Sequence, residues 1–182
     1  MFKYQPYYCE ENAWWLCQHP NLGDVMRWVV FISNTQRACL MWQQRAAQLG
    51  SPILWDYHVV VMTPGLIWDL DTRLATPAGA GEYLQQTFLH LSNSYAAEVP
   101  QNHLYAPQFR VVAAADYIGM LQTDRSHMRQ SDGTWRHPPP PWPPMNTPGH
   151  PSNLQSFIDM TTSGVGNILS LEDMLSTYGF DP

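Results

Sequence analysis

The chain has few charged side chains, and its basic residues are scattered. Lys, Arg, Asp and Glu together make up 13% of the 182 residues, against about a quarter in an average globular protein. The formal net charge is −6, and no basic cluster is longer than a residue or two. A protein that follows nucleic-acid phosphates needs a basic face. This charge balance therefore excludes nucleic acid as a partner.

Long hydrophobic runs are also missing. No apolar stretch in the sequence approaches the roughly 20 residues that span a membrane. The opening segment, MFKYQPYYCEEN, lacks the apolar centre of a signal peptide. We therefore expect no membrane partner and a soluble, intracellular protein.

Cysteine is scarce, at three residues: Cys9, Cys17 and Cys39. An odd number without a secretion signal does not indicate a disulfide framework. The sequence has no CxxC pair and its seven histidines are dispersed, so zinc-type spacing is absent and we expect no metal. Two interpretations remain: one nucleophilic cysteine served by His and Asp elsewhere in the chain, or three buried, inert thiols.

Hydrophobic periodicity predicts an α+β fold: a single domain over residues 1–182 with an antiparallel sheet and flanking helices. Thr63-Pro64-Gly65-Leu66 has the residues of a hairpin turn. The expected strands are 27–33, 53–62, 67–71 and 108–115, and the expected helices are 10–18, 39–49, 82–95 and 171–179.

The segment 124–152 is rich in Pro, Gly and polar residues and cannot form a regular element. It is either a disordered linker or a loop strapped over the domain. Disordered segments are poor in aromatic residues, so the anchors Trp135, Trp142 and Met145 favour the strap. Arg125 and His127 are expected to hold this loop in place rather than to contact substrate.

Cys9 directly precedes the first expected helix, whose first turn holds Glu10 and Glu11. A helix N-terminus presents free N–H groups and a partial positive charge. We expect this position to lower the pKa of the thiol and to supply donors for an oxyanion. The alternative is a small core residue just outside a helix.

His58 lies in an otherwise apolar strand, where a buried imidazole needs a hydrogen-bond partner. With the turn as assigned, His58 faces Asp71 across the hairpin, and Asp69 is its diagonal neighbour on the same face. Asp56 shares that face. An aspartate beside an imidazole suits a Cys–His–Asp triad, and the residues alone leave the aspartate undecided. A metal site at His58 lacks a second histidine at ligand spacing.

These residues lie in blocks that run in order along nearly the whole chain: YCEENAWWLC (8–17), VVFISN (29–34), LWDYHVV (54–60), IWDLDT (67–72), QFRV (108–111), DRSHM (124–128) and GTWRHPPPPWP (133–143). In these blocks the sequence resembles the protein N-terminal glutamine amidohydrolase family, which converts an N-terminal Gln into Glu. The resemblance implies a papain- and transglutaminase-like arrangement, with Cys9 as nucleophile, His58 as general base and Asp69 as third member. The hairpin geometry instead places Asp71 directly opposite His58. Between these two aspartates we follow the resemblance and choose Asp69 as the third member of the triad.

The resemblance further implies protein or peptide substrates that bear an N-terminal Gln, and a thioester intermediate. It places the enzyme in the N-degron pathway and in the cytoplasm, with the nucleus as a second location, and we expect a monomer that needs no cofactor. Reading a free α-ammonium requires an acceptor, for which Glu10, Asp56 and backbone carbonyls are the candidates. Ser33 is a further candidate for substrate binding. Glu11, Asn12 and Asn34 are further residues that either line the site or serve structure. The alternatives are a related transglutaminase-like or cysteine-protease-like thiol enzyme, and an inactive peptide-binding module.

Overall fold

A six-stranded antiparallel sheet forms the centre of the computed structural model, which describes residues 1–88 and 104–178. The strand order is β6-β5-β4-β1-β7-β8. Their bounds are β1 Trp28–Ser33, β4 His58–Thr63, β5 Leu66–Trp68, β6 Ala78–Gly79, β7 Gln108–Ala113 and β8 Asn167–Ser170. A separate two-stranded sheet pairs β2 (Cys39–Met41) with β3 (Ile53–Trp55).

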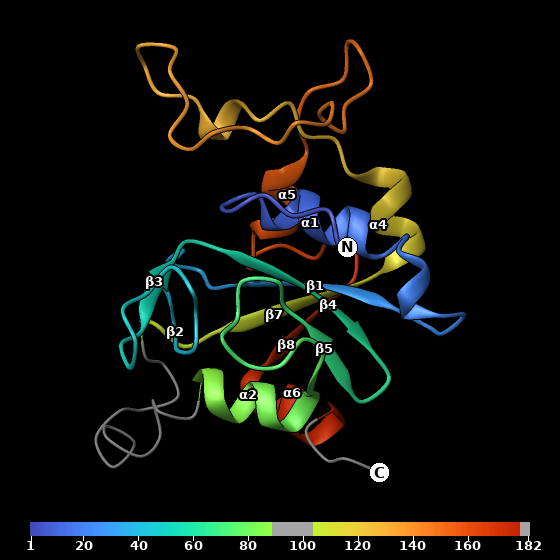
Figure 1. The fold of residues 1–182 in the computed structure, drawn as a ribbon, viewed down its shortest axis with the longest axis vertical. Helices are drawn as coiled ribbons and strands as arrows, with labels where there is room; N and C mark the ends of the chain where they lie inside the picture. The colour runs from blue at the N-terminus through green and yellow to red at the C-terminus, as the bar shows by residue number, and fades with distance from the viewer. Residues whose placement is uncertain (89–103, 179–182) are drawn as a thin grey trace.

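Helices cover both faces of the large sheet (Figure 1). One face carries α1 (Cys9–Leu16), α4 (Ala114–Met120) and α5 (Leu154–Ile158), and the other carries α2 (Ala80–Phe88) and α6 (Leu171–Tyr178). Single 3₁₀ turns occur at Pro20–Leu22 and Ser126–Met128. No helix within residues 1–88 and 104–178 is long and apolar enough to cross a membrane.

Two hydrophobic cores follow from the alternation of side chains along the central strands. Val59 and Val61 of β4 point into the core beneath α1, α4 and α5. Val60 and Met62 point into the opposite core, which α2 and α6 close. The central strands are buried on both faces, which explains why β1 and β4 are continuous apolar runs. The mixed fold with an antiparallel sheet and flanking helices is confirmed.

The helix predicted over residues 39–49 is wrong. Cys39 and Met41 belong to β2, where both are fully buried and pair with Trp55 and Ile53 of β3. The chain then turns, and Gln44 forms an isolated bridge with Thr72. Local helix propensity yields here to strand pairing and burial, because tertiary contacts outweigh a weak local preference.

The strand predicted over 53–62 is two strands in different sheets. The extended conformation is interrupted between β3 and β4, where the Asp56 carboxylate accepts a hydrogen bond from the Tyr57 amide at 2.9 Å. The Asp56 carbonyl accepts from Ser33 Oγ at 2.6 Å. These bonds replace those of a strand ladder, so the backbone can change direction just before His58.

The other elements match their predictions more closely. The strands at 27–33 and 108–115 and the helices at 10–18 and 171–179 are confirmed, with ends shifted by up to two residues. The return strand at 67–71 is shorter, because its pairing ends at Trp68. The helix predicted at 82–95 is present as α2, and residues 89–95 lie outside the described residues. The helices α4 and α5 and the strands β6 and β8 were not predicted from the sequence.

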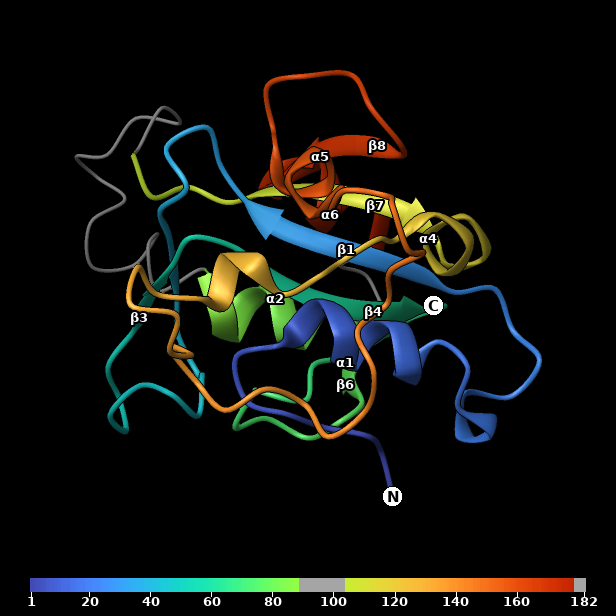
Figure 2. The same ribbon diagram turned by 90° about the horizontal axis from the view of Figure 1, so that it is seen from above.

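The segment 124–152 runs along the side of the sheet that carries α1 (Figures 1 and 2). Arg125 donates from Nε and from a terminal nitrogen to the two carboxylate oxygens of Glu11, at 2.6 and 2.7 Å. Trp142 donates its indole N–H to Glu11 at 2.7 Å, and its carbonyl accepts from Arg125 at 2.8 Å. Glu11 of α1 therefore ties the segment to the helix at two points.

Candidate active site

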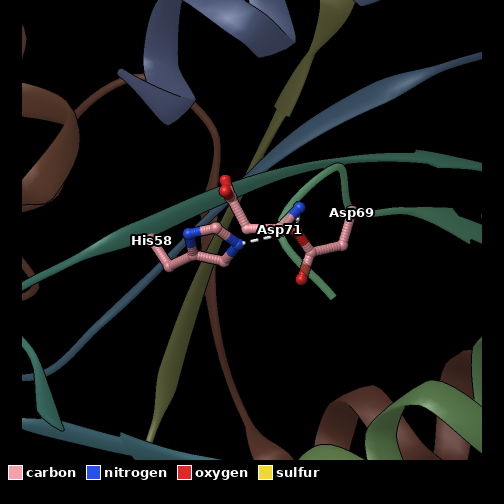
Figure 3. A group of neighbouring side chains, drawn as sticks. All are labelled: His58, Asp69 and Asp71. Carbon is pink, nitrogen blue, oxygen red and sulfur yellow. Dashed lines mark hydrogen bonds and ion pairs between the residues drawn. The ribbon is translucent and has the colours of Figure 1, made fainter. Parts of the chain in front are cut away.

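His58 and Asp69 form the central contact of the site. His58 opens β4 and Asp69 directly follows β5, so the β4–β5 hairpin brings them together. Nε2 of His58 lies 2.9 Å from Oδ1 of Asp69 (Figure 3). Their side chains are 2% and 0% exposed. At this burial the hydrogen bond is shielded from water and fixes the plane of the imidazole.

Asp69 is held by a full set of donors. Oδ1 also accepts from the Asp71 backbone amide at 2.8 Å. Oδ2 accepts from Gln44 Nε2 at 3.1 Å and from the Tyr83 hydroxyl at 2.9 Å. Burial alone raises the pKa of Asp69, but His58 and these donors outweigh burial and lower it. Asp69 is therefore an oriented, ionised carboxylate.

The carboxylate of Asp69 changes the acid–base behaviour of His58. Burial alone lowers the pKa of this imidazole, but the charge and hydrogen bond of Asp69 outweigh burial and raise it. The structure therefore stabilises an imidazolium at His58, which is what a general base becomes after it accepts a proton.

Asp71 lies beside this pair but has a different partner. Its Oδ1 accepts from the Tyr4 hydroxyl at 2.5 Å, and its carboxylate points away from that of Asp69 (Figure 3). The predicted register holds where Thr63 faces Leu66, but the ladder ends at the Val61–Trp68 pair. The extrapolation that set Asp71 directly opposite His58 is therefore wrong.

The same three residues have the donor atoms of a small metal site. One ligand-type atom from each of His58, Asp69 and Asp71 falls within 4.8 Å of the others. Both oxygens of Asp69 already accept two hydrogen bonds, and Asp71 accepts one from Tyr4. The hydrogen-bond network among these residues therefore explains why their ligand-type atoms lie close together, and no metal ion is needed to explain it.

Cys9 is the first residue of α1 and is 8% exposed. It packs against Val59 and Val61 of β4, and the Val59 backbone amide faces its sulfur. Val59 directly follows His58 in β4, so Cys9 packs against the strand that carries the imidazole. Among the described residues, the Cys9 thiol donates to Glu10 Oε2 at 3.9 Å and makes no hydrogen bond to His58.

The prediction that the helix start lowers the pKa of Cys9 is wrong for this structure. Burial raises the pKa of the thiol well above its ordinary value, and the neighbouring Glu10 carboxylate raises it further. These two effects outweigh the partial positive charge of the helix end. The resting cysteine is consequently a thiol and needs a base to remove its proton.

Glu10 and Asp56, two candidates for substrate binding, have different surroundings. Glu10 is fully buried. Its Oε2 accepts from the Tyr57 hydroxyl at 3.1 Å, and its Oε1 lies 3.6 Å from His127 Nε2. Burial raises the pKa of Glu10 to about 8. Asp56 is exposed.

The remaining candidates have structural partners. The Ser33 hydroxyl donates to the Asp56 carbonyl, and Glu11 binds Arg125. The Asn12 side chain exchanges hydrogen bonds with the Gln5 backbone, and that of Asn34 donates to several loop carbonyls.

Sequence reasoning missed several residues that surround the pair. Gln44 and Tyr83 hold Asp69, and Tyr57 binds Glu10. Trp55 stacks on His58, with ring centroids 5.9 Å apart. A tyrosine in an apolar helix usually indicates core packing, and Gln44 lay in a segment predicted to be helical. Only the position of Trp55 and Tyr57 beside His58 in WDYH was a usable signal.

Comparison with known proteins identifies the family of this chain. The model of the N-terminal glutamine amidase family matches residues 4–178. The chain belongs to the N-terminal glutamine amidase family. Cys9, His58 and Asp69 all fall within the matched range of that amidase model.

Curated relatives support the assignment to the amidase family over nearly full length. A protein N-terminal glutamine amidohydrolase of Danio rerio is 36% identical, covering 97% of this chain and 89% of the relative. The protein of the same name in Homo sapiens is 35% identical, covering 97% and 87%. That of Drosophila melanogaster is 33% identical, covering 96% and 87%. The resemblance drawn from the sequence blocks is therefore confirmed.

Proposed function

We propose that this protein hydrolyses the side-chain carboxamide of an N-terminal glutamine in proteins and peptides, which yields glutamate and ammonia. Membership of the N-terminal glutamine amidase family is the observation that carries this proposal. The buried His58–Asp69 pair supports the proposal, because an aspartate bonded to an imidazole suits the acid–base chemistry that the reaction needs.

The first half of the reaction forms a thioester. His58 accepts the proton of the Cys9 thiol, and the sulfur attacks the carboxamide carbon of the substrate. The tetrahedral oxyanion accepts hydrogen bonds from N–H groups near the start of α1. The imidazolium, stabilised by Asp69, then gives its proton to the departing nitrogen, and ammonia leaves as the carbon–nitrogen bond breaks.

The second half restores the enzyme. His58 accepts a proton from water as the water oxygen attacks the thioester carbon. The carbon–sulfur bond breaks, the sulfur regains the proton from His58, and the new γ-carboxyl group leaves as glutamate. Every proton in this scheme passes through His58, so the scheme uses no cofactor.

We further propose that the site has the papain- and transglutaminase-like arrangement. Cys9 opens a helix, while His58 and Asp69 come from one antiparallel hairpin, and this placement supports the proposal. Glu10 and Asp56 are the carboxylates from which an acceptor for the substrate α-ammonium is to be drawn. Ser33 is a further candidate for substrate binding, and its hydroxyl donates to the Asp56 backbone carbonyl.

A set of three peptides tests the proposed activity. A Gln-initiated peptide should release ammonia, and mass spectrometry should show the replacement of amide by acid at the first residue. The N-acetylated peptide and a peptide whose only Gln is internal should not react. Ammonia release from the internal Gln, or incorporation of an added amine, would contradict the proposal and indicate transglutaminase-type chemistry.

A further inference from the structure

Two neighbouring glutamates in the first turn of α1 are equally buried but unequally partnered. Glu10 and Glu11 are both 0% exposed. Glu11 accepts from the Arg125 guanidinium at both oxygens and from the Trp142 indole. Oε1 of Glu10 has no hydrogen-bond partner among the described residues. Burial raises the pKa of Glu10 to about 8, so near neutral pH the free enzyme holds much of this group as the neutral acid, and a buried carboxyl oxygen without a partner is costly. This oxygen is therefore a candidate for a ligand group whose positive charge would favour the ionised form.

His127 lies close to this oxygen but does not satisfy it. Nε2 of His127 is 3.6 Å away, beyond hydrogen-bond length. Burial lowers the pKa of His127, so the imidazole carries little positive charge near neutral pH. Arg125, the nearby guanidinium, is engaged with Glu11. No described cation is therefore placed against Oε1 of Glu10.

Glu10 lies between the Cys9 thiol and a surface hollow, just as the α-ammonium of an N-terminal glutamine lies between its carboxamide and the rest of the peptide. On one side, the Cys9 sulfur lies 3.9 Å from Oε2 of Glu10. On the other side, His127 separates Oε1 from a surface hollow of about 430 Å³, which is also lined by Asp124, Ser126, Pro151, Ser152, Leu154 and Gln155. In an extended glutamine, about 5 Å separates the carboxamide carbon from the α-nitrogen. A glutamine bound at the thiol can thus reach Glu10 with its α-ammonium, and its peptide chain can continue toward the hollow.

We propose that Oε1 of Glu10 binds the free α-ammonium of the substrate, so that Glu10 is the residue that selects a chain terminus over an internal glutamine. This inference rests on the proposed deamidation of N-terminal glutamine. An ammonium supplies both the hydrogen bond and the positive charge that this oxygen lacks. An acylated or internal nitrogen supplies no charge, and the peptide attached to it adds bulk where Glu10 is fully enclosed.

A comparison of two substrates isolates this contact. One is a Gln-initiated peptide, and the other carries a 4-carbamoylbutanoyl group in place of Gln, which keeps the carboxamide and removes only the α-amine. The ratio of the two kcat/KM values reports ammonium recognition, since effects on the thiol cancel. A site built to bind a substrate N–H group rejects an analogue without it by about 10⁴-fold. We expect a ratio of that order for the wild type and a fall of at least about 100-fold in Glu10→Gln.

The control is Glu82→Gln, the same chemical change on exposed Glu82 of α2, across the sheet from α1. It should keep the wild-type ratio. Glu10→Asp, which keeps a carboxylate, should retain more of the ratio than Glu10→Gln does. The Kd values of both peptides for Cys9→Ala enzyme, with and without Glu10→Gln, report the same preference in the absence of catalysis. Glu10→Gln should weaken binding of the Gln-initiated peptide and leave binding of the analogue without the α-amine nearly unchanged.

Three results would overturn the inference. In the first, Glu10→Gln lowers kcat/KM for both substrates by the same factor, which would assign Glu10 a role at the thiol or in folding alone. In the second, the ratio collapses in Asp56→Asn and not in Glu10→Gln, which would move recognition to the exposed carboxylate. In the third, the wild type turns over both substrates at similar rates. A wild type that releases no ammonia from the Gln peptide would instead refute the proposed function.

Discussion

Replacing Asp69 by asparagine should remove one negative charge and leave the shape of the site nearly unchanged. Oδ1 faces two donors, His58 Nε2 and the Asp71 amide, so the asparagine carbonyl belongs there. The new NH₂ group then faces Gln44 and Tyr83. Oε1 of Gln44 is buried without a partner, and a flip of this amide offers it as acceptor. We therefore expect little change in melting temperature.

The rate should fall much further than the stability. After His58 accepts the thiol proton, its imidazolium in the Asp69→Asn variant has a neutral neighbour in place of a carboxylate. Removing one partner of a buried ion pair costs about 3–5 kcal/mol. At 1.36 kcal/mol for each tenfold change in rate, kcat should fall by about 10²–10⁴-fold. Steady-state ammonia release measures kcat, and thermal unfolding followed by circular dichroism measures stability.

The pH profile gives a second measurement on the same variant. His58 accepts the thiol proton only when neutral, so kcat/KM should rise as the pH increases through its pKa. Asp69 raises that pKa, which places the acidic limb of the wild-type profile above pH 6.5, the ordinary value for histidine. Without the carboxylate, the pKa of the buried His58 falls, and the acidic limb should move to lower pH.

Asp71→Asn is the matched control for this prediction. Asp71 binds Tyr4 and not His58, so the variant should keep most of its kcat and lose about 1 kcal/mol of stability, the contribution of one hydrogen bond. Near-normal activity in Asp69→Asn together with an inactive but folded Asp71→Asn would refute the assignment. An unchanged acidic limb in Asp69→Asn would refute the electrostatic argument separately.

Two further predictions concern α1. Cys9→Ala should abolish ammonia release. Cys17→Ala and Cys39→Ala should keep most of it in folded protein, because both thiols lie in apolar cores. Turnover by Cys9→Ala would show that another group is the nucleophile. Glu11→Gln should leave Arg125 buried without its carboxylate and lower the free energy of unfolding by about 3–5 kcal/mol. Guanidinium denaturation measures that loss, and an unchanged midpoint would mean that the pair does not hold segment 124–152.

Sequence reasoning worked best where a polar residue had to be buried and therefore needed a hydrogen-bond partner. A histidine within an apolar strand had to have a partner, and a hairpin turn read from Pro64-Gly65 placed two aspartates near it. The register was correct at Thr63 and Leu66. It failed only beyond Trp68, where the Asp69 carboxylate bonds the Asp71 amide in place of a ladder partner. Such a local bond competes with strand pairing and cannot be read from alternation.

Properties that depend on tertiary contacts could not be read from the sequence. The pKa of Cys9 is decided by burial and by the orientation of Glu10, and neither follows from a position at a helix start. Gln44 reaches Asp69 only because residues 42–49 turn rather than form a helix. Tyr83 lies on a helix where its ring suits core packing, and its hydroxyl gained a role only once α2 was placed against the sheet.

The pairing of Glu11 with Arg125 also bears on when the enzyme can become active during its synthesis. The two residues are 114 positions apart, and both lie in the interior. Until Arg125 has left the ribosome, docking α1 would bury the Glu11 carboxylate alone, which costs several kcal/mol. We therefore expect α1, the helix that carries Cys9, to stay undocked on a nascent chain. A chain truncated before residue 124 should accordingly show Cys9 as reactive toward thiol reagents as in an unfolded peptide, and protection of Cys9 in that fragment would disprove this order of assembly.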